Sequence, residues 1–323
     1  MSSGNRRRLD SIQSSEVALI LAVAFIHAGG WIAAAIAVET ILPATLASLR
    51  FILAGTLLLV VARLRGSPLG TDNLRALLVV SLIGVALSHA LFYHGLRLAP
   101  VADGVVLSTA LSPTLAVLFA LPVLHERISA KGVLGVVVSA AGVTLVVFEA
   151  GTDTTGGDRL IGDLLLIGGA IATAMYTVIG RVAMRSGSPL GVVASTTFIG
   201  GIALAPLAIF ESTTAPAIAW SAEVWAAFLY LTLPSAGLSA VLFYVLIRRS
   251  GATRATLASY VVPVIVLAWS TFVQDDPLTP ARVIGAVFAI LGVRLVLSGS
   301  TAMTLSPEED RHVRGVVVSG REP

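Results

Sequence analysis

The chain contains no cysteine, little charge and one lysine. Among its 323 residues, Asp, Glu, Lys and Arg together make up 12%, and Lys131 is the one lysine among 21 basic residues. The lack of cysteine excludes disulfides, thiolate metal sites and cysteine nucleophiles. Soluble domains carry about 25% charged residues, so a charge content this low argues against a soluble globular protein.

Apolar residues dominate instead. They make up 56% of the chain and give it a mean hydropathy of +0.93. A spanning helix needs about 20 mainly apolar residues, because the hydrocarbon core is about 30 Å thick and a helix rises about 1.5 Å per residue. The first apolar run follows a charged start, as in a signal peptide, but the many runs after it favour an uncleaved first span. We therefore predict an all-α integral membrane protein with ten transmembrane helices, at 17–38, 43–64, 74–96, 101–123, 130–149, 161–184, 189–211, 222–247, 252–273 and 280–298.

The basic residues predict the orientation of the chain, since cytoplasmic loops of membrane proteins are enriched in Lys and Arg. We expect a multi-pass protein of the cell inner membrane whose ends, 1–16 and a disordered tail 300–323, are both cytoplasmic. The excess of basic over acidic residues is then explained by orientation in the lipid bilayer, which is the expected partner, and no nucleic acid is expected. The inner loops of this arrangement hold Arg63, Arg65, Arg75, Arg127, Lys131, Arg181, Arg185, Arg248, Arg249 and Arg254.

Two segments about 150 residues apart carry the same pattern. "HERISAKGVLGVVVSAAGV" (125–143) aligns with "DDPLTPARVIGAVFAILGV" (275–293), and Gly135 meets Gly285 without a gap. The first segment begins with His-Glu-Arg, and the second has Asp-Asp-Pro at the same positions. This change is expected if the two segments end on opposite sides of the membrane.

The repeat divides the chain into two related halves, 17–149 and 161–299, each with five predicted spans. "ALSHALFYHGLRLAP" (86–100) and "GLSAVLFYVLIRRSG" (237–251) share a Leu-Ser and a Leu-Phe-Tyr element across the same interval. Five is odd, so the second half enters the membrane from the opposite face. Two inverted repeats around a site at the bilayer midplane are a recurring plan of secondary transporters.

Three motifs of the first half carry a family resemblance. They are "PATLASLRFILAG" (43–55), "LSPTLAVLFALPVLHERIS" (111–129) and the glycine-spaced "GVLGVVVSAAGVTLVV" (132–147). In their order and spacing, residues 15–299 resemble the EamA-type ten-helix transporters of the drug/metabolite transporter superfamily. The resemblance implies a secondary transporter that exports small organic metabolites by alternating access, with neither cofactor nor metal. The absence of a Walker-type motif agrees with transport that does not hydrolyse ATP.

Polar and aromatic residues at membrane depth are the candidates for a substrate pocket, because polar groups in hydrocarbon tend to face a cavity or a partner. A pocket of aromatic rings, hydroxyls and imidazoles suits neutral or zwitterionic, amino-acid-like solutes. Each serine or tyrosine also has an ordinary alternative, a hydrogen bond between packed helices. The candidate substrate contacts are His27, Trp31, Arg50, His89, Tyr93, Ser108, Ser112, Tyr176, Ser259 and Tyr260.

Three of these candidates leave specific alternatives open. Arg50 lies about seven residues, or ~10 Å of helix, below the outer end of its span, where an unpaired arginine costs at least ~2.5 kcal/mol. It either pairs with Asp103 or holds a substrate carboxylate in two bonds. His27 and His89 either carry protons, since imidazole titrates near neutral pH, or bond a neighbouring carbonyl and stay neutral.

Other repeated features predict moving or packing elements. Pro113 and Pro263 occupy matching mid-helix positions and are candidate hinges, because proline removes a backbone donor. Tyr93 and its counterpart Tyr244 lie toward opposite faces, as paired gates or as aromatics of the interface belts. The glycines spaced by seven in the fifth and tenth spans predict a scaffold or a homodimer contact.

Two other functional classes were weighed. Asp275 and Asp276 invite comparison with the metal-binding aspartates of prenyl transferases, but a second acidic cluster at helical spacing is missing. No HExxH or GxSxG motif occurs either, so we do not expect an enzyme. A non-transporting or flippase-type membrane partner stays open as the alternative to a transporter.

Overall fold

The computed structural model describes residues 3–69, 73–124, 129–152, 158–183, 188–214, 218–239, 242, 246 and 257–299. These residues form a bundle of helices, and no strand occurs among them. The elements are α1 (Ser3–Thr40), α2 (Pro43–Leu64), α3 (Leu74–Val79), η2 (Val80–Leu87), α4 (Ser88–Leu98), α5 (Val101–Leu124), α6 (Ala130–Thr152), α7 (Asp158–Ala183), α8 (Pro189–Thr214), α9 (Ala222–Tyr230), η3 (Leu231–Leu238), α12 (Leu257–Val273) and α13 (Pro280–Gly299).

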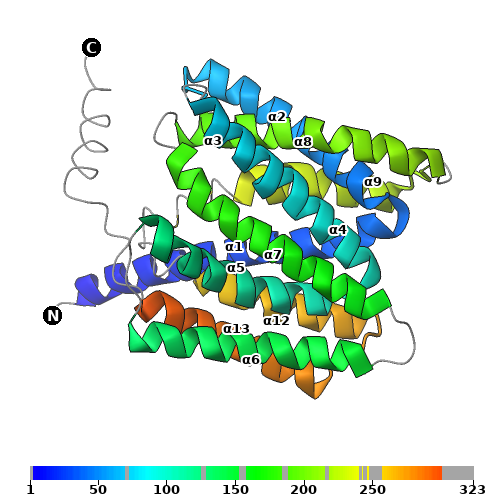
Figure 1. Cartoon of the computed structure of the whole chain (residues 1–323). Helices are drawn as coiled ribbons and strands as arrows, with labels where there is room; N and C mark the ends of the chain where they lie inside the picture. The colour runs from blue at the N-terminus through cyan, green and yellow to red at the C-terminus, as the bar shows by residue number, and fades with distance from the viewer. Residues whose placement is uncertain are drawn as a thin grey trace, which may run out of the picture.

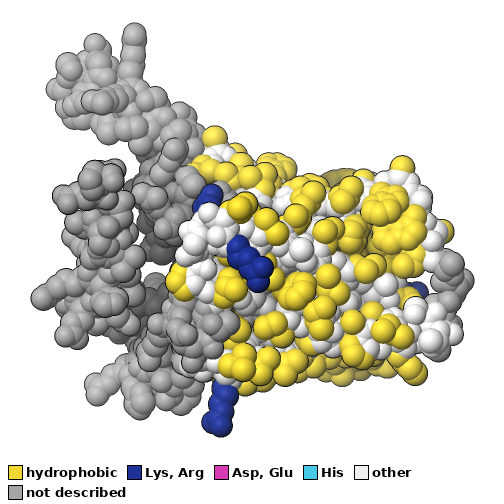
Figure 2. Space-filling view, turned by 90° about the horizontal axis from the view of Figure 1, so that it is seen from above, with side chains coloured by type: hydrophobic (Ala, Val, Ile, Leu, Met, Phe, Trp, Pro, Cys, Tyr) yellow, Lys and Arg dark blue, Asp and Glu magenta, His cyan; other side chains and the backbone are white. Residues whose placement is uncertain are grey.

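The predicted membrane spans correspond to helices of this bundle. Eight helical stretches in the described residues are long and apolar enough to cross a membrane, and a shorter apolar helix, Val261–Val273, belongs to the ninth predicted span. The predicted span 222–247 coincides with α9 and η3, and the rest of it lies largely outside the described residues. Hydrophobic side chains cover most of the described surface in Figure 2, as contact with lipid requires. The all-α membrane fold is confirmed.

The two halves of the chain are interleaved rather than set side by side. α1, the first helix of the first half, packs on α9, η3 and α12 of the second half. α7, the first helix of the second half, packs on η2, α4 and α5 of the first. Two further pairs, α2 with α8 and α6 with α13, lie at opposite edges of the bundle (Figure 1). Each half therefore supplies its first helix to the other half, as expected of two inverted five-helix repeats.

Glycines bring α6 and α13 into backbone contact. A Cβ atom at Gly135 would lie 2.6 Å from the carbonyl oxygen of Gly292, and one at Gly142 would lie 2.9 Å from that of Gly285. The reverse contacts exist too, because Gly292 and Gly285 face the same two glycines. The glycine faces of the two helices are thus used within the chain, which supports the scaffold interpretation. A homodimer formed through another surface stays a prediction.

An irregular helical segment occurs at the same place in both halves. η2 and η3 are π-helical segments of eight residues, about 150 residues apart. Directly after each, a serine hydroxyl donates to the carbonyl four residues earlier: Ser88 to Gly84 and Ser239 to Ser235, both at 2.5 Å. Such π-helical turns are rare and frequently lie at functional sites. The repeated Leu-Ser element of the sequence lies at the end of each of the two segments.

A candidate solute cavity between the two repeats

A cavity of about 560 Å³ lies between the two halves. Helices of both repeats form its wall, and its volume is within the range of sites that bind small molecules. Among the described residues its lining holds one charged side chain, Arg50, and no carboxylate. The lining residues are His27, Gly30, Trp31, Ala34, Arg50, Ser88, His89, Phe92, Tyr93, Ser108, Thr109, Ser112, Pro113, Gly169, Thr173, Leu231, Ser235, Ser259, Val262 and Val293.

Most of the residues selected from the sequence come together in this cavity, although their contact with a substrate stays a prediction. Tyr176 is outside the lining, because its ring packs against Gly84 of η2. Tyr260 belongs to α12, and its side chain lies outside the described residues. The candidates that line the cavity are His27, Trp31, Arg50, His89, Tyr93, Ser108, Ser112 and Ser259, together with the candidate hinge Pro113 but without Pro263.

Sequence reasoning missed several lining residues. Thr173 lies near the middle of α7, so the same count of depth that selected Ser108 could have selected it. Leu231 and Ser235 contribute from η3, where the helix changes from α to π geometry. No pattern in the sequence signals that change of helical geometry.

Arg50 is held at the cavity wall by two uncharged groups. Its Nε donates to the carbonyl oxygen of Leu231 at 3.1 Å, and its Nη1 donates to the hydroxyl of Tyr93. The guanidinium carbon also lies 5.0 Å from the centre of the Phe51 ring. Among the residues that the structure describes, none supplies Arg50 with a carboxylate. Of the two alternatives for Arg50, the pairing with Asp103 is wrong, because two other arginines bind that carboxylate.

His89 bonds within its own helix. Its Nδ1 lies 3.0 Å from the carbonyl oxygen of Val85 and 3.0 Å from the hydroxyl of Ser88. The imidazole meets the Phe51 ring edge-on, with the ring centres 4.5 Å apart. Of the two expected arrangements, the structure has the histidine at a neighbouring carbonyl. His27 is half-buried in the cavity wall.

An aromatic wall stands beside Arg50. Phe92 meets Trp31 and Tyr93 edge-on, each with ring centres 5.0 Å apart. The Tyr93 side chain is fully buried, so it is not an aromatic of the interface belt, which would lie among lipid headgroups. Its counterpart Tyr244 is outside the described residues.

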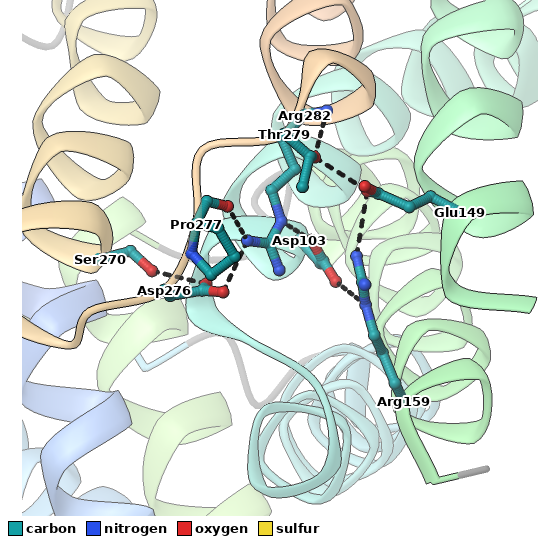
Figure 3. Close-up of polar contacts among 8 residues, drawn as sticks. All are labelled: Asp103, Glu149, Arg159, Ser270, Asp276, Pro277, Thr279 and Arg282. Atoms are coloured by element: carbon teal, nitrogen blue, oxygen red, sulfur yellow. Dashed lines mark hydrogen bonds and ion pairs between the residues drawn. The ribbon is translucent and has the colours of Figure 1, made fainter. Parts of the chain in front are cut away.

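At one end of the bundle, beyond the cavity wall, five charged residues form a connected set that we term the Asp103 network (Figure 3). The Asp103 carboxylate is buried and accepts from Arg159 Nε at 2.8 Å and Arg282 Nε at 2.7 Å. Arg159 also donates to Glu149 at 3.3 Å, and Arg282 donates to Asp276 at 2.7 Å. The two repeats thus share one ionic network, since each half supplies both helices and charges to it.

Neighbouring polar groups extend this network into the segment that precedes α13. Arg282 Nη1 donates to the carbonyl oxygen of Pro277 at 2.8 Å, and the Ser270 hydroxyl donates to Asp276 at 2.9 Å (Figure 3). The network lies close to the cavity, because Gly104, next to Asp103, packs against the cavity wall: a Cβ there would lie 3.2 Å from the Trp31 ring. The Asp103 network and the cavity wall are therefore joined by this packing of Gly104 against Trp31.

A bundle of two interleaved five-helix repeats around a central cavity defines a multi-pass membrane protein of the inverted-repeat transporter class. Comparison with known proteins gives the family: the model of the EamA-like transporter family matches residues 14–148 and 160–298, and the chain belongs to this family. The two matched segments correspond to the two halves of the bundle.

Similar proteins carry transporter names. "Uncharacterized transporter YyaM" of Bacillus subtilis (strain 168) is 29% identical over 262 residues, which cover 80% of this chain and 85% of the relative. An "Uncharacterized transporter" of Archaeoglobus fulgidus is 28% identical over 287 residues, covering 87% and 97%. A solved crystal structure with 21% identity aligns with a TM-score of 0.60 over 88% of this chain and 98% of that chain, which supports the fold.

Proposed function

We propose that this EamA-type transporter is a secondary transporter of small zwitterionic, amino-acid-like solutes and exports them by alternating access. The observation that carries this proposal is the state of Arg50. Its guanidinium lies at the cavity wall with a tyrosine hydroxyl and a backbone carbonyl as its partners. Neither partner neutralises its charge.

The carboxylate of a solute would supply the missing charge. A guanidinium binds a carboxylate in two parallel hydrogen bonds, which are about twice as strong as neutral ones. The Leu231 carbonyl and the Tyr93 hydroxyl hold the fork in place without competing as anions. One positive charge in the lining matches one carboxylate, which favours monoanionic or zwitterionic solutes over polyanions.

The rest of the lining suits the other end of such a solute. An ammonium group is attracted to aromatic faces, and Trp31 and Phe92 supply aromatic rings on the same wall. Ser108 and Ser112 supply hydroxyls, and among the described residues none is hydrogen-bonded to them. These groups support recognition of a polar solute without a second fixed charge.

The orientation and partners belong to the same proposal. The positive-inside rule assigns both termini to the cytoplasm of a cell with the protein in its inner membrane, so the Asp103 network faces outward. We infer no enzymatic activity, because the similar proteins are named as transporters. The lipid bilayer and a small-molecule substrate are the proposed partners, with a homodimer as an option and no role for nucleic acid.

Transport by reconstituted vesicles tests this function. Lipid vesicles that contain the purified protein are loaded with pooled labelled amino acids and related metabolites. Their efflux is compared with that from empty vesicles, which carry the same solutes but no protein. We expect efflux of zwitterionic solutes by the wild-type protein. Loss of this activity is expected in Arg50→Lys, because an ammonium group cannot present the planar fork.

The matched control is Arg97→Lys, which changes an exposed arginine at the end of α4. This variant is expected to transport like the wild type. Efflux by the wild type no faster than from empty vesicles would contradict the transporter function. Normal transport by Arg50→Lys would contradict the carboxylate anchor alone.

A further inference from the structure

Asp163 of α7 is a buried carboxylic acid without a hydrogen-bond partner. Its side chain is 0% exposed, and within the described part of the chain neither carboxylate oxygen is hydrogen-bonded. An ionised carboxylate in such a place loses its hydration without a hydrogen bond to replace it. Asp103, which is equally buried, has two arginines to compensate for that loss.

The side chain lies beside the Asp103 network. Asp163 follows Arg159 by four residues, so both side chains are on one face of α7, and Arg159 binds Asp103. One turn further along this face, the Leu166 side chain packs at Gly104 on α5. The face of α7 that carries Asp163 is therefore turned toward α5 at the level of Asp103.

Four helices, α5, α6, α7 and α13, supply the charged groups that act on Asp163. Asp103 of α5, Glu149 of α6, Arg159 of α7 and Arg282 of α13 all interact electrostatically with it. Asp276, before α13, is bound to Arg282. On the side of α4, the groups next to the preceding Gly162 are Gly95 and Ala99, which carry no charge.

The balance of these charges favours a proton on Asp163. The Asp103 network contains three carboxylates and two guanidinium groups, so it is already negative by one charge. An ionised Asp163 would add a second negative charge in a site closed to water. A like charge nearby and burial both disfavour the charged form of a carboxyl group.

We propose that Asp163 is the proton-binding site of this transporter and that it is protonated while the Asp103 network is assembled. The proton comes from water at the Asp103 end and resides on a carboxylate oxygen. When it returns to water, the Asp163 carboxylate competes with Asp103 for Arg159 and Arg282. This competition loosens the contact between the two repeats and links proton movement to opening of this end.

The protonation itself is tested without a substrate. The infrared spectrum of the purified protein in lipid discs at neutral pH is expected to contain the carbonyl stretch of a buried protonated carboxyl group. This band is expected to be lost in Asp163→Asn and to move to a different frequency in Asp163→Glu. The matched control, Asp158→Asn, changes an exposed carboxylate of the same helix and is expected to keep the band.

Two infrared results would overturn the proposal. One is the absence of a protonated carboxyl band in the wild type at neutral pH. The other is a band that persists unchanged in Asp163→Asn. If Asp163→Asn does not fold, the frequency of the band in Asp163→Glu decides, because a carbonyl of a different residue in the same site absorbs differently.

The link to transport rests on the proposed function and has its own measurement. In vesicles, Asp163→Asn is expected to keep solute exchange at equal pH on both sides. The solute accumulation driven by an imposed pH gradient is expected to fall at least tenfold in this variant. Accumulation as in the wild type would overturn the link. If the wild type moves no solute, the proposed function fails, and the infrared result still decides the proton site.

Discussion

Arg282 donates from Nε to Asp103 across 2.7 Å, although the two residues are 179 positions apart in the sequence. The bond joins α13, the last helix of the second repeat, to α5, the fourth span of the first repeat. Arg159, from the first helix of the second repeat, occupies the other oxygen of the same carboxylate. This end of the bundle is therefore held by one buried anion between two cations, while the described lining of the cavity contains the cation Arg50 and no carboxylate.

We expect Asp103→Asn to destabilise the protein strongly. Removing one partner of a buried ion pair leaves uncompensated charge and costs about 3–5 kcal/mol. Here the buried Arg282 and the partly buried Arg159 both lose the buried carboxylate that they share. Unfolding in detergent, followed by circular dichroism against temperature, measures this loss. Asp276→Asn is the control, because that carboxylate is partly exposed and shares Arg282 with Asp103. Equal stability of the two variants would contradict the central role of Asp103.

Tyr93→Phe is expected to weaken solute binding without unfolding the protein. The substitution keeps the buried ring and removes the hydroxyl that accepts from Arg50. A hydrogen bond to a charged group contributes about 1.5–3 kcal/mol, so the solute concentration for half-maximal transport should rise about tenfold or more. Tyr176→Phe serves as the control, since Tyr176 does not line the cavity. Similar effects of the two variants would argue against a specific role for the Tyr93 hydroxyl.

The sequence predicted the spans and the repeat because both are recognised from the residue pattern within single segments. Apolar run length gave α2 its bounds, and the spacing of Gly135 and Gly142 marked the close contact between α6 and α13. The depth of a side chain along a helix follows from counting, which is why residues such as His89 and Ser112 were selected and line one cavity.

The partners of charged groups were not predictable in the same way. Pairing of Asp103 with Arg50 was one of two alternatives because both lie toward the same end, but depth does not tell which helices are neighbours. Asp163 was not selected, because the predicted span 161–184 placed it at the water-exposed end of a helix. α7 in fact begins at Asp158, and the helices packed around it bury Asp163 completely.

His89→Gln is expected to leave coupling to a pH gradient intact. The Nδ1 of His89 is bound at the Val85 carbonyl, and we assign the proton site to Asp163. Glutamine preserves a donor of similar reach and cannot be protonated near neutral pH. The ratio of solute accumulated with and without a pH gradient should therefore match that of the wild type. A variant that still exchanges solute but has lost this ratio would transfer the proton site to His89.

The inverted orientation of the two repeats can be tested by labelling, because the chain has no cysteine of its own. Ser129 precedes α6, and Gln274 lies in the segment that precedes α13, the matching helix of the second repeat; both are exposed. In intact cells, a maleimide that cannot cross membranes should label Gln274→Cys at once and Ser129→Cys only after the cells are opened. Neither substitution alters an Arg or Lys, so the charges that orient the chain stay the same. If both cysteines react in intact cells, or neither does, these matching ends lie on one side of the membrane, and two repeats threaded in opposite senses are no longer possible.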